Sequence, residues 1–249
     1  MEPVEHILLL GDSIIDNGRY VPEGQPCVRE QLEAVIKAHG LPWLVTQAAR
    51  DGAVMENVYM SQFYDSPRDA TVIVLSAGGN DGLCYFRDLQ RRPWATLTSF
   101  LSTFRAGYEK MLRKIRKTFP GVPVVLCTIY QAQLGSDLGW FTDTVASLGV
   151  RLLNWIIRDI AAQQCLPLLD LWFIFDRRED FANAIEPGVP GGHKLVRNLM
   201  CLLKAGDHYG PSKHVIYADA NYDPSFVERI PLVTHFKAQR EVFGASVIQ

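Results

Sequence analysis

The stretch HILLLGDSIIDN, residues 6–17, joins an uninterrupted apolar run to a turn of Gly, Asp and Ser. A continuous apolar run is typical of a strand that is buried on both faces, as in a parallel sheet covered by helices. The run ends at Gly11, and the next two residues carry a carboxylate and a hydroxyl. Because open parallel sheets bind ligands beyond the carboxyl ends of their strands, Ser13 is a candidate site residue.

Further apolar runs follow along the chain, rich in branched residues and bounded by turn signals. These runs predict strands at 43–48, 70–76, 123–129 and 167–171, and apolar stripes at helical spacing predict amphipathic helices at 99–117 and 142–164. Alternating strands and helices at this spacing favour right-handed crossovers and a three-layer α/β/α domain. We therefore expect an α/β fold built on a parallel five-stranded sheet.

The length and charge of the chain limit its organisation and its partners. With 249 residues and 48% hydrophobic content, one large domain is expected over residues 1–205. Residues 206–249 have mixed polarity, three prolines and no clean period, which predicts an irregular C-terminal extension packed on or near the domain. The formal net charge is −2, and no run of Lys or Arg is dense enough to follow a phosphate backbone. We expect no nucleic-acid partner.

The N-terminus and the cysteines bear on location and on metal binding. MEPVEH is acidic and lacks the basic flank and apolar region of a signal peptide, and no segment approaches the ~20 apolar residues that span a bilayer. We expect a cytoplasmic protein without a membrane span. The five cysteines are widely separated and form no C-x-x-C pair, which argues against a disulfide framework and against a thiolate zinc site. No metal is expected.

Four predicted strand ends carry residues suited to acyl transfer. The first is followed by GDS with Ser13, the second by ARDG with Gly52, and the third by AGGND with Asn80. The fifth is followed by a loop that holds NAIEPG at 183–188, with Asn183 and Glu186. A serine hydroxyl can attack a carbonyl, and the resulting oxyanion needs preorganised donors. Gly52 can offer an unobstructed backbone N–H, and Asn80 a carboxamide N–H.

In these blocks the chain resembles the SGNH hydrolases, also called GDSL-type esterases or lipases. Their motifs are a GDS serine after the first strand, a glycine after the second, G-x-N-D after the third and usually D-x-x-H before the last helix. Ser13, Gly52 and Asn80 match the first three blocks, with Gly11, Asp12, Gly78 and Asp81 as block neighbours. The resemblance covers residues 6–203. It implies a flavodoxin-like sheet of strand order 2-1-3-4-5 and cofactor-free hydrolysis of small-molecule carboxylic esters at a shallow site.

The fourth block departs from the family pattern, because Asn183 and Glu186 occupy the places of the family's Asp and His. Three interpretations follow. Glu186 acts as the base itself, which requires burial to raise a pKa that is ordinarily about 4.3. Alternatively, a histidine enters the site, either His193 or one of three in the tail, which are His208, His214 and His235. In the third interpretation catalysis has been lost, and a catalytically silent binding or scaffolding protein remains.

The residues around the serine have structural interpretations beside the chemical one. Asp12 is expected to hold the turn through hydrogen bonds to backbone N–H groups and so to fix where Ser13 points. Asp16 and Asn17 either line the mouth of the site or serve structure alone. The sequence contains no G-x-S-x-G elbow, Walker loop, H-E-x-x-H or G-x-G-x-x-G motif, so other hydrolases, NTPases, zincins and Rossmann dehydrogenases are unsupported.

Overall fold

The computed structural model describes residues 4–89, 93–131, 140–204 and 214–215. Its strands form one sheet in the order β2-β1-β3-β4-β5-β6, and every neighbouring pair is parallel. The strands are β1 (His6–Gly11), β2 (Leu44–Gln47), β3 (Val72–Ser76), β4 (Val124–Cys127), β5 (Leu168–Leu169) and β6 (His214–Val215). The first five confirm the expected strand order.

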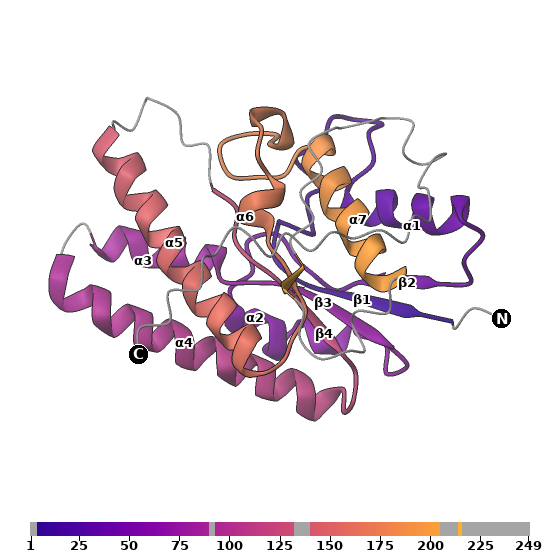
Figure 1. The fold of residues 1–249 in the computed structure, drawn as a ribbon, viewed down its shortest axis with the longest axis horizontal. Helices are drawn as coiled ribbons and strands as arrows, with labels where there is room; N and C mark the ends of the chain where they lie inside the picture. The colour runs from indigo at the N-terminus through magenta and orange to yellow at the C-terminus, as the bar shows by residue number, and fades with distance from the viewer. Residues whose placement is uncertain (1–3, 90–92, 132–139, 205–213, 216–249) are drawn as a thin grey trace, which may run out of the picture.

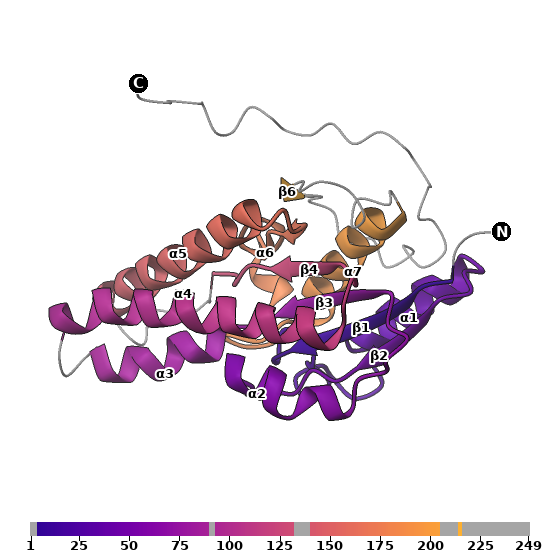
Figure 2. The same cartoon turned by 90° about the horizontal axis from the view of Figure 1, so that it is seen from below.

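Helices connect the strands and cover both faces of the sheet (Figures 1 and 2). They are α1 (Val28–Ala38), α2 (Met55–Met60), α3 (Gly79–Leu89), α4 (Pro93–Thr118), α5 (Trp140–Gln163), α6 (Leu171–Ile174) and α7 (Val189–Lys204), with 3-10 turns η1 (Gln62–Tyr64) and η3 (Arg178–Asp180). The helix predicted at 99–117 lies within α4, and the helix predicted at 142–164 lies within α5 except for its last residue. The start of α4 at Pro93 agrees with the preference of proline for a first helical turn.

The sheet separates two apolar cores, and alternate residues of each central strand point into opposite ones. Ile7 and Leu9 of β1 pack with α1 and α7, whereas Leu8 and Leu10 pack with α2, α4 and α5. All four side chains are at most 1% exposed. Burial on both faces is the physical reason for the unbroken apolar run in the sequence, and it makes β1 a rigid support for the turn that follows.

The last residue of β1 is held in a conformation that glycine alone tolerates. Gly11 has φ +129°, and a Cβ atom there would lie 1.7 Å from the Ser76 carbonyl oxygen on β3. The buried Gln62 side chain accepts from the Gly11 N–H at 2.9 Å and donates to its carbonyl at 2.7 Å. These contacts fix the point at which the chain leaves the sheet and enters the Ser13 turn.

The predicted C-terminal extension lies largely outside the described residues. Within 206–249 the structure describes only β6, which continues the sheet beyond β5 as a sixth parallel strand. The boundary between domain and extension therefore stays a prediction. Among the residues that are described, no helix is both long and apolar enough to cross a membrane.

Candidate functional site

The turn after β1 is organised by the Asp12 carboxylate. Its Oδ1 accepts hydrogen bonds from the Ser76 hydroxyl at 2.7 Å and from the Ile14 N–H at 3.2 Å. The Asp12 carbonyl accepts from the N–H groups of Ile15 and Asp16. Burial raises the pKa of Asp12 to about 7, although the bonds from Ser76 and Ile14 act in the opposite direction. These are the contacts expected of a residue that holds the turn and so orients Ser13, which is 7% exposed.

Gly52 and Asn80 lie in two segments that are tied to each other. Gly52 has φ +75°, a left-handed conformation that a side chain would strain. The next residue, Ala53, accepts a hydrogen bond through its carbonyl from Asn80 Nδ2 at 3.0 Å. Asp81 Oδ2 accepts from the Met55 N–H, also at 3.0 Å, and burial raises the pKa of this carboxyl. The second and third blocks therefore form one unit.

Asp16 ties this unit to the serine turn. One of its carboxylate oxygens accepts from the Asp51 N–H at 2.8 Å, directly before Gly52, and the other accepts from the Gln47 side chain at 2.9 Å. The Arg50 N–H donates to the Gly11 carbonyl at 3.0 Å. The structure thus gathers the predicted Ser13, Gly52 and Asn80 blocks at the carboxyl ends of β1, β2 and β3.

The loop between η3 and α7 carries Glu186 and is closed by local hydrogen bonds. Asn183 Oδ1 accepts from the N–H groups of Ile185 at 2.9 Å and Glu186 at 3.0 Å. The Glu186 carbonyl accepts from the Ala182 N–H at 2.9 Å, and Phe181 and Pro187 form an antiparallel bridge. Asn183 therefore contacts the backbone of Glu186, and it fixes the course of the loop through that backbone.

The Glu186 side chain reaches the serine turn. Its carboxylate interacts with the Ser13 hydroxyl, and this interaction lowers the pKa of Glu186. Burial is the larger effect, the Asp51 charge adds to it, and together they raise the pKa of Glu186 to about 7. The residue is 6% exposed, and its Oε2 has no hydrogen-bond partner in the described part of the chain. The structure thus places a carboxyl that titrates near neutrality beside the candidate nucleophile.

The alternative bases lie in α7 and further along the chain. His193 lies near the start of α7 and is buried at 8% exposure. His214 lies in β6, whereas His208 and His235 fall outside the described residues. No group of three or more His, Cys, Asp or Glu side chains in the described ranges is arranged to hold a metal ion.

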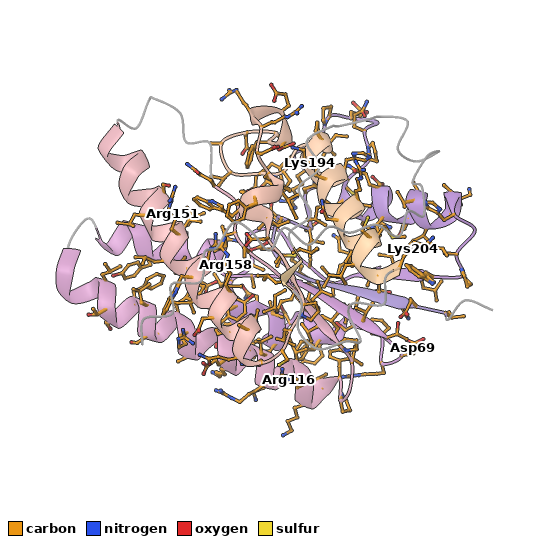
Figure 3. All side chains as sticks on the ribbon, viewed as in Figure 1. Asp69, Arg116, Arg151, Arg158, Lys194 and Lys204 are labelled. Carbon is orange, nitrogen blue, oxygen red and sulfur yellow. The ribbon has the colours of Figure 1, made fainter. Side chains whose placement is uncertain are left out.

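Several residues that hold the Glu186 loop were not predicted from the sequence. The Tyr130 hydroxyl, just after β4, donates to the Ile185 carbonyl. Lys194 is buried at the start of α7 and pairs with Asp180 at 2.7 Å, at the N-terminal end of the loop (Figure 3). The position of Tyr130 directly beyond an apolar run was the available signal. Its acceptor is a backbone carbonyl, which leaves no trace in the sequence.

The Asp51 carboxylate, next to Gly52, is held by polar groups of its own. The Tyr20 hydroxyl donates to both oxygens of Asp51 at 3.0 Å, and Arg19 lies 3.9 Å from the same carboxylate. Burial raises the pKa of Tyr20 to about 12, and the charge of Glu186 contributes to that shift. Asp51 is thereby held where its charge acts on Glu186.

Comparisons with known proteins bear on the family and the fold of the chain. The model of the GDSL-like lipase/acylhydrolase family matches residues 9–189. No curated protein sequence matches the chain significantly.

Three solved structures illustrate the likeness in fold. A lipase from a goat rumen metagenome has a TM-score of 0.61 and 17% identity, covering 79% of this chain and 96% of its own. Phospholipase A1 from Streptomyces albidoflavus has a TM-score of 0.60 and 16% identity, covering 79% and 99%. An acetyl xylan esterase has a TM-score of 0.59 and 18% identity, covering 78% and 98%. At such identities the likeness shows a shared fold.

Proposed function

Because the chain belongs to the GDSL-like lipase/acylhydrolase family, we propose that it is a serine-dependent hydrolase of small-molecule carboxylic esters. Ser13 is the nucleophile in this proposal, and Glu186 is the general base. The observation that carries the proposal is a buried Glu186 carboxylate that interacts with the Ser13 hydroxyl and whose pKa burial raises to about 7. A base with a pKa near the working pH combines a useful ionised fraction with proton affinity.

The first half of the reaction forms an acyl-enzyme. Ser13 Oγ attacks the ester carbonyl while its proton passes to the Glu186 carboxylate, and a tetrahedral intermediate forms. Collapse of that intermediate breaks the bond to the leaving alcohol, which takes the proton from Glu186. In the second half, water attacks the acyl-serine and gives its proton to Glu186. Release of the acid returns that proton to Ser13 Oγ.

The negative charge on the intermediate requires donors that are already in place. The backbone N–H groups of Ser13 and Gly52 are proposed for this task, together with the Asn80 carboxamide. A carboxamide nitrogen carries two hydrogens, and the one directed at the Ala53 carbonyl leaves the other for the oxyanion. The bond to Ala53 also orients the Asn80 amide, since it restrains rotation of that side chain.

Hydrolysis of short-chain acyl esters by purified protein tests the proposal. Wild type is compared with Ser13→Ala, Glu186→Gln and His193→Gln, each checked for folding by circular dichroism. We expect turnover by wild type, loss of at least about 100-fold in kcat for Ser13→Ala and Glu186→Gln, and a smaller effect of His193→Gln.

The outcomes separate the candidate functions. Unchanged turnover by Ser13→Ala contradicts the nucleophile. Full loss in His193→Gln with an active Glu186→Gln assigns the base to the histidine. Absence of turnover by wild type, together with ester-analogue binding that survives Ser13→Ala, favours the catalytically silent binding protein.

A further inference from the structure

Asn17 is a fully buried polar side chain, four residues beyond Ser13, whose contacts reach two other parts of the chain. Its Oδ1 accepts a hydrogen bond at 2.9 Å from the N–H of Val28, the first residue of α1. Its Nδ2 donates at 3.0 Å to the carbonyl of Pro187, which directly follows Glu186. The two bonds span 11 and 170 residues of the sequence, and through them Asn17 joins the serine turn, the start of α1 and the Glu186 loop.

We propose that Asn17 is a positioning residue, which holds the Glu186 loop at the distance from the Ser13 turn that proton transfer requires. This inference rests on the proposed function, because it concerns the geometry between its nucleophile and its base.

The argument starts from how the loop is anchored. The bonds from Asn183 and Ala182 close the loop on itself, but they do not set where it lies relative to β1. Longer-range contacts set that position: Phe181 packs against Tyr130 and Phe175 at the start of the loop, and two hydrogen bonds flank Glu186 directly. Tyr130 holds the carbonyl on its N-terminal side, and Asn17 holds the carbonyl on its C-terminal side. Of these two, only Asn17 belongs to the turn that carries the nucleophile.

Pro187 makes the Asn17 bond a direct constraint on Glu186. Proline has no N–H, so its carbonyl is the only backbone group through which a hydrogen bond can hold this residue. The ring also fixes φ of Pro187, so that restraining the carbonyl restrains the peptide leading back to Glu186. Asn17 is itself held in place, because its Oδ1 accepts from the first N–H of α1 and its carbonyl accepts from the Tyr20 N–H at 2.9 Å.

Two substitutions distinguish the two hydrogen bonds of the Asn17 side chain. Asn17→Asp keeps an oxygen for the Val28 N–H but replaces the amide donor with an oxygen that faces the Pro187 carbonyl. Asn17→Leu keeps the approximate volume and removes both bonds. Asn198→Leu is the matched control, because Asn198 is also buried, and its amide donates to the Lys194 carbonyl within α7.

The readouts are kcat and KM for a short acyl ester and the rate at which a fluorophosphonate labels Ser13. A misplacement of about 1 Å costs on the order of 100-fold in rate. We expect kcat and the labelling rate to fall about 10- to 100-fold in both Asn17 variants, with KM changed less than about threefold. For Asn198→Leu we expect kcat and the labelling rate to stay near wild type, whatever the change in melting temperature.

The pattern of results decides between positioning and a merely structural role. Wild-type kcat and labelling in a folded Asn17→Asp overturn the inference, as does a loss of activity in Asn198→Leu as large as in the Asn17 variants. If Asn17→Leu fails to fold, Asn17→Asp still decides, because its bond to α1 is retained. Failure of the proposed function has a different signature, since wild type is then neither labelled at Ser13 nor inactivated by Glu186→Gln.

Discussion

Replacing Glu186 with Gln should make the protein more stable while making it inactive. The substitution keeps the shape of the side chain and an acceptor oxygen for Ser13, and it removes the charge. The pKa of Glu186 is raised from 4.5 to about 7 in the folded protein, with burial as the main cause. A raised folded-state pKa means that the charged carboxylate is held in the fold at a free-energy cost.

The raised pKa of Glu186 determines the sign of the stability difference between wild type and Glu186→Gln and the pH range over which it develops. Below pH 4.5 the carboxyl is protonated in both states and costs nothing. As the pH rises to about 7, the unfolded chain ionises first, so wild type loses stability relative to Glu186→Gln; above pH 7 the difference is constant. The full pKa shift corresponds to a free-energy difference of about 3 kcal/mol. Because solvent screening makes this an upper limit, we expect a difference of about 1–3 kcal/mol.

Urea unfolding at pH 5, 6, 7 and 8.5 measures this difference. We expect the free energy of unfolding of Glu186→Gln to exceed that of wild type at pH 8.5 and the gap to close toward pH 5. Glu179→Gln is the control, because Glu179 is an exposed carboxylate near the same loop, and it should change stability by less than about 0.5 kcal/mol. A gap for Glu186→Gln that does not vary with pH, or wild type being the more stable at pH 8.5, would refute the reasoning.

Other substitutions probe the support of the site. Asp12→Asn keeps the acceptor for Ser76 and Ile14, so we expect kcat within about tenfold of wild type; a loss as large as that of Ser13→Ala would give Asp12 a chemical role. Gly11→Ala forces a Cβ to 1.7 Å from the Ser76 carbonyl, and denaturant unfolding should show a loss of about 4 kcal/mol or more, which wild-type stability would contradict. Asp51→Asn removes a charge that raises the pKa of Glu186, so the acid limb of kcat/KM should move to lower pH, and a shift upward would refute that coupling. Lys194→Met removes the cationic partner of the buried Asp180 carboxylate and leaves it the Arg177 N–H. We expect about 3–5 kcal/mol of destabilisation by urea unfolding, and a neutral effect would show that Asp180 does not need the charge of Lys194.

The sheet could be predicted because its central strands are covered on both faces. The apolar runs that became β1, β3 and β4 are continuous since α1 and α7 pack on one face and α2, α4 and α5 on the other. β6 was not foreseen, because two residues in a polar region carry no periodic signal. Gly11 was recognised only as a motif neighbour, and its need to be glycine comes from the Ser76 carbonyl on a neighbouring strand.

The candidate site could likewise be predicted only in part from the sequence. The segments carrying Ser13, Gly52 and Asn80 could be predicted to meet, because the carboxyl ends of parallel strands share one edge of the sheet. The choice between Glu186 and a histidine depends on side-chain placement that motif order does not specify. Asn183 was expected in the place of the family's Asp, yet its oxygen accepts from the loop backbone. The role of Asn17 stayed open because both partners of its side chain are backbone groups, whose positions carry no signal in the sequence.

The most direct test of the central claim, that Glu186 activates Ser13, is the rate of fluorophosphonate labelling as a function of pH, with the modified residue identified by mass mapping. Wild type, Ser13→Ala and Glu186→Gln are compared. The account predicts labelling of wild type at Ser13 with a rate that rises with pH through about 7, no labelling of Ser13→Ala, and a rate for Glu186→Gln that is at least about 100-fold lower. Labelling of Glu186→Gln at the wild-type rate, with the fold intact, would contradict it.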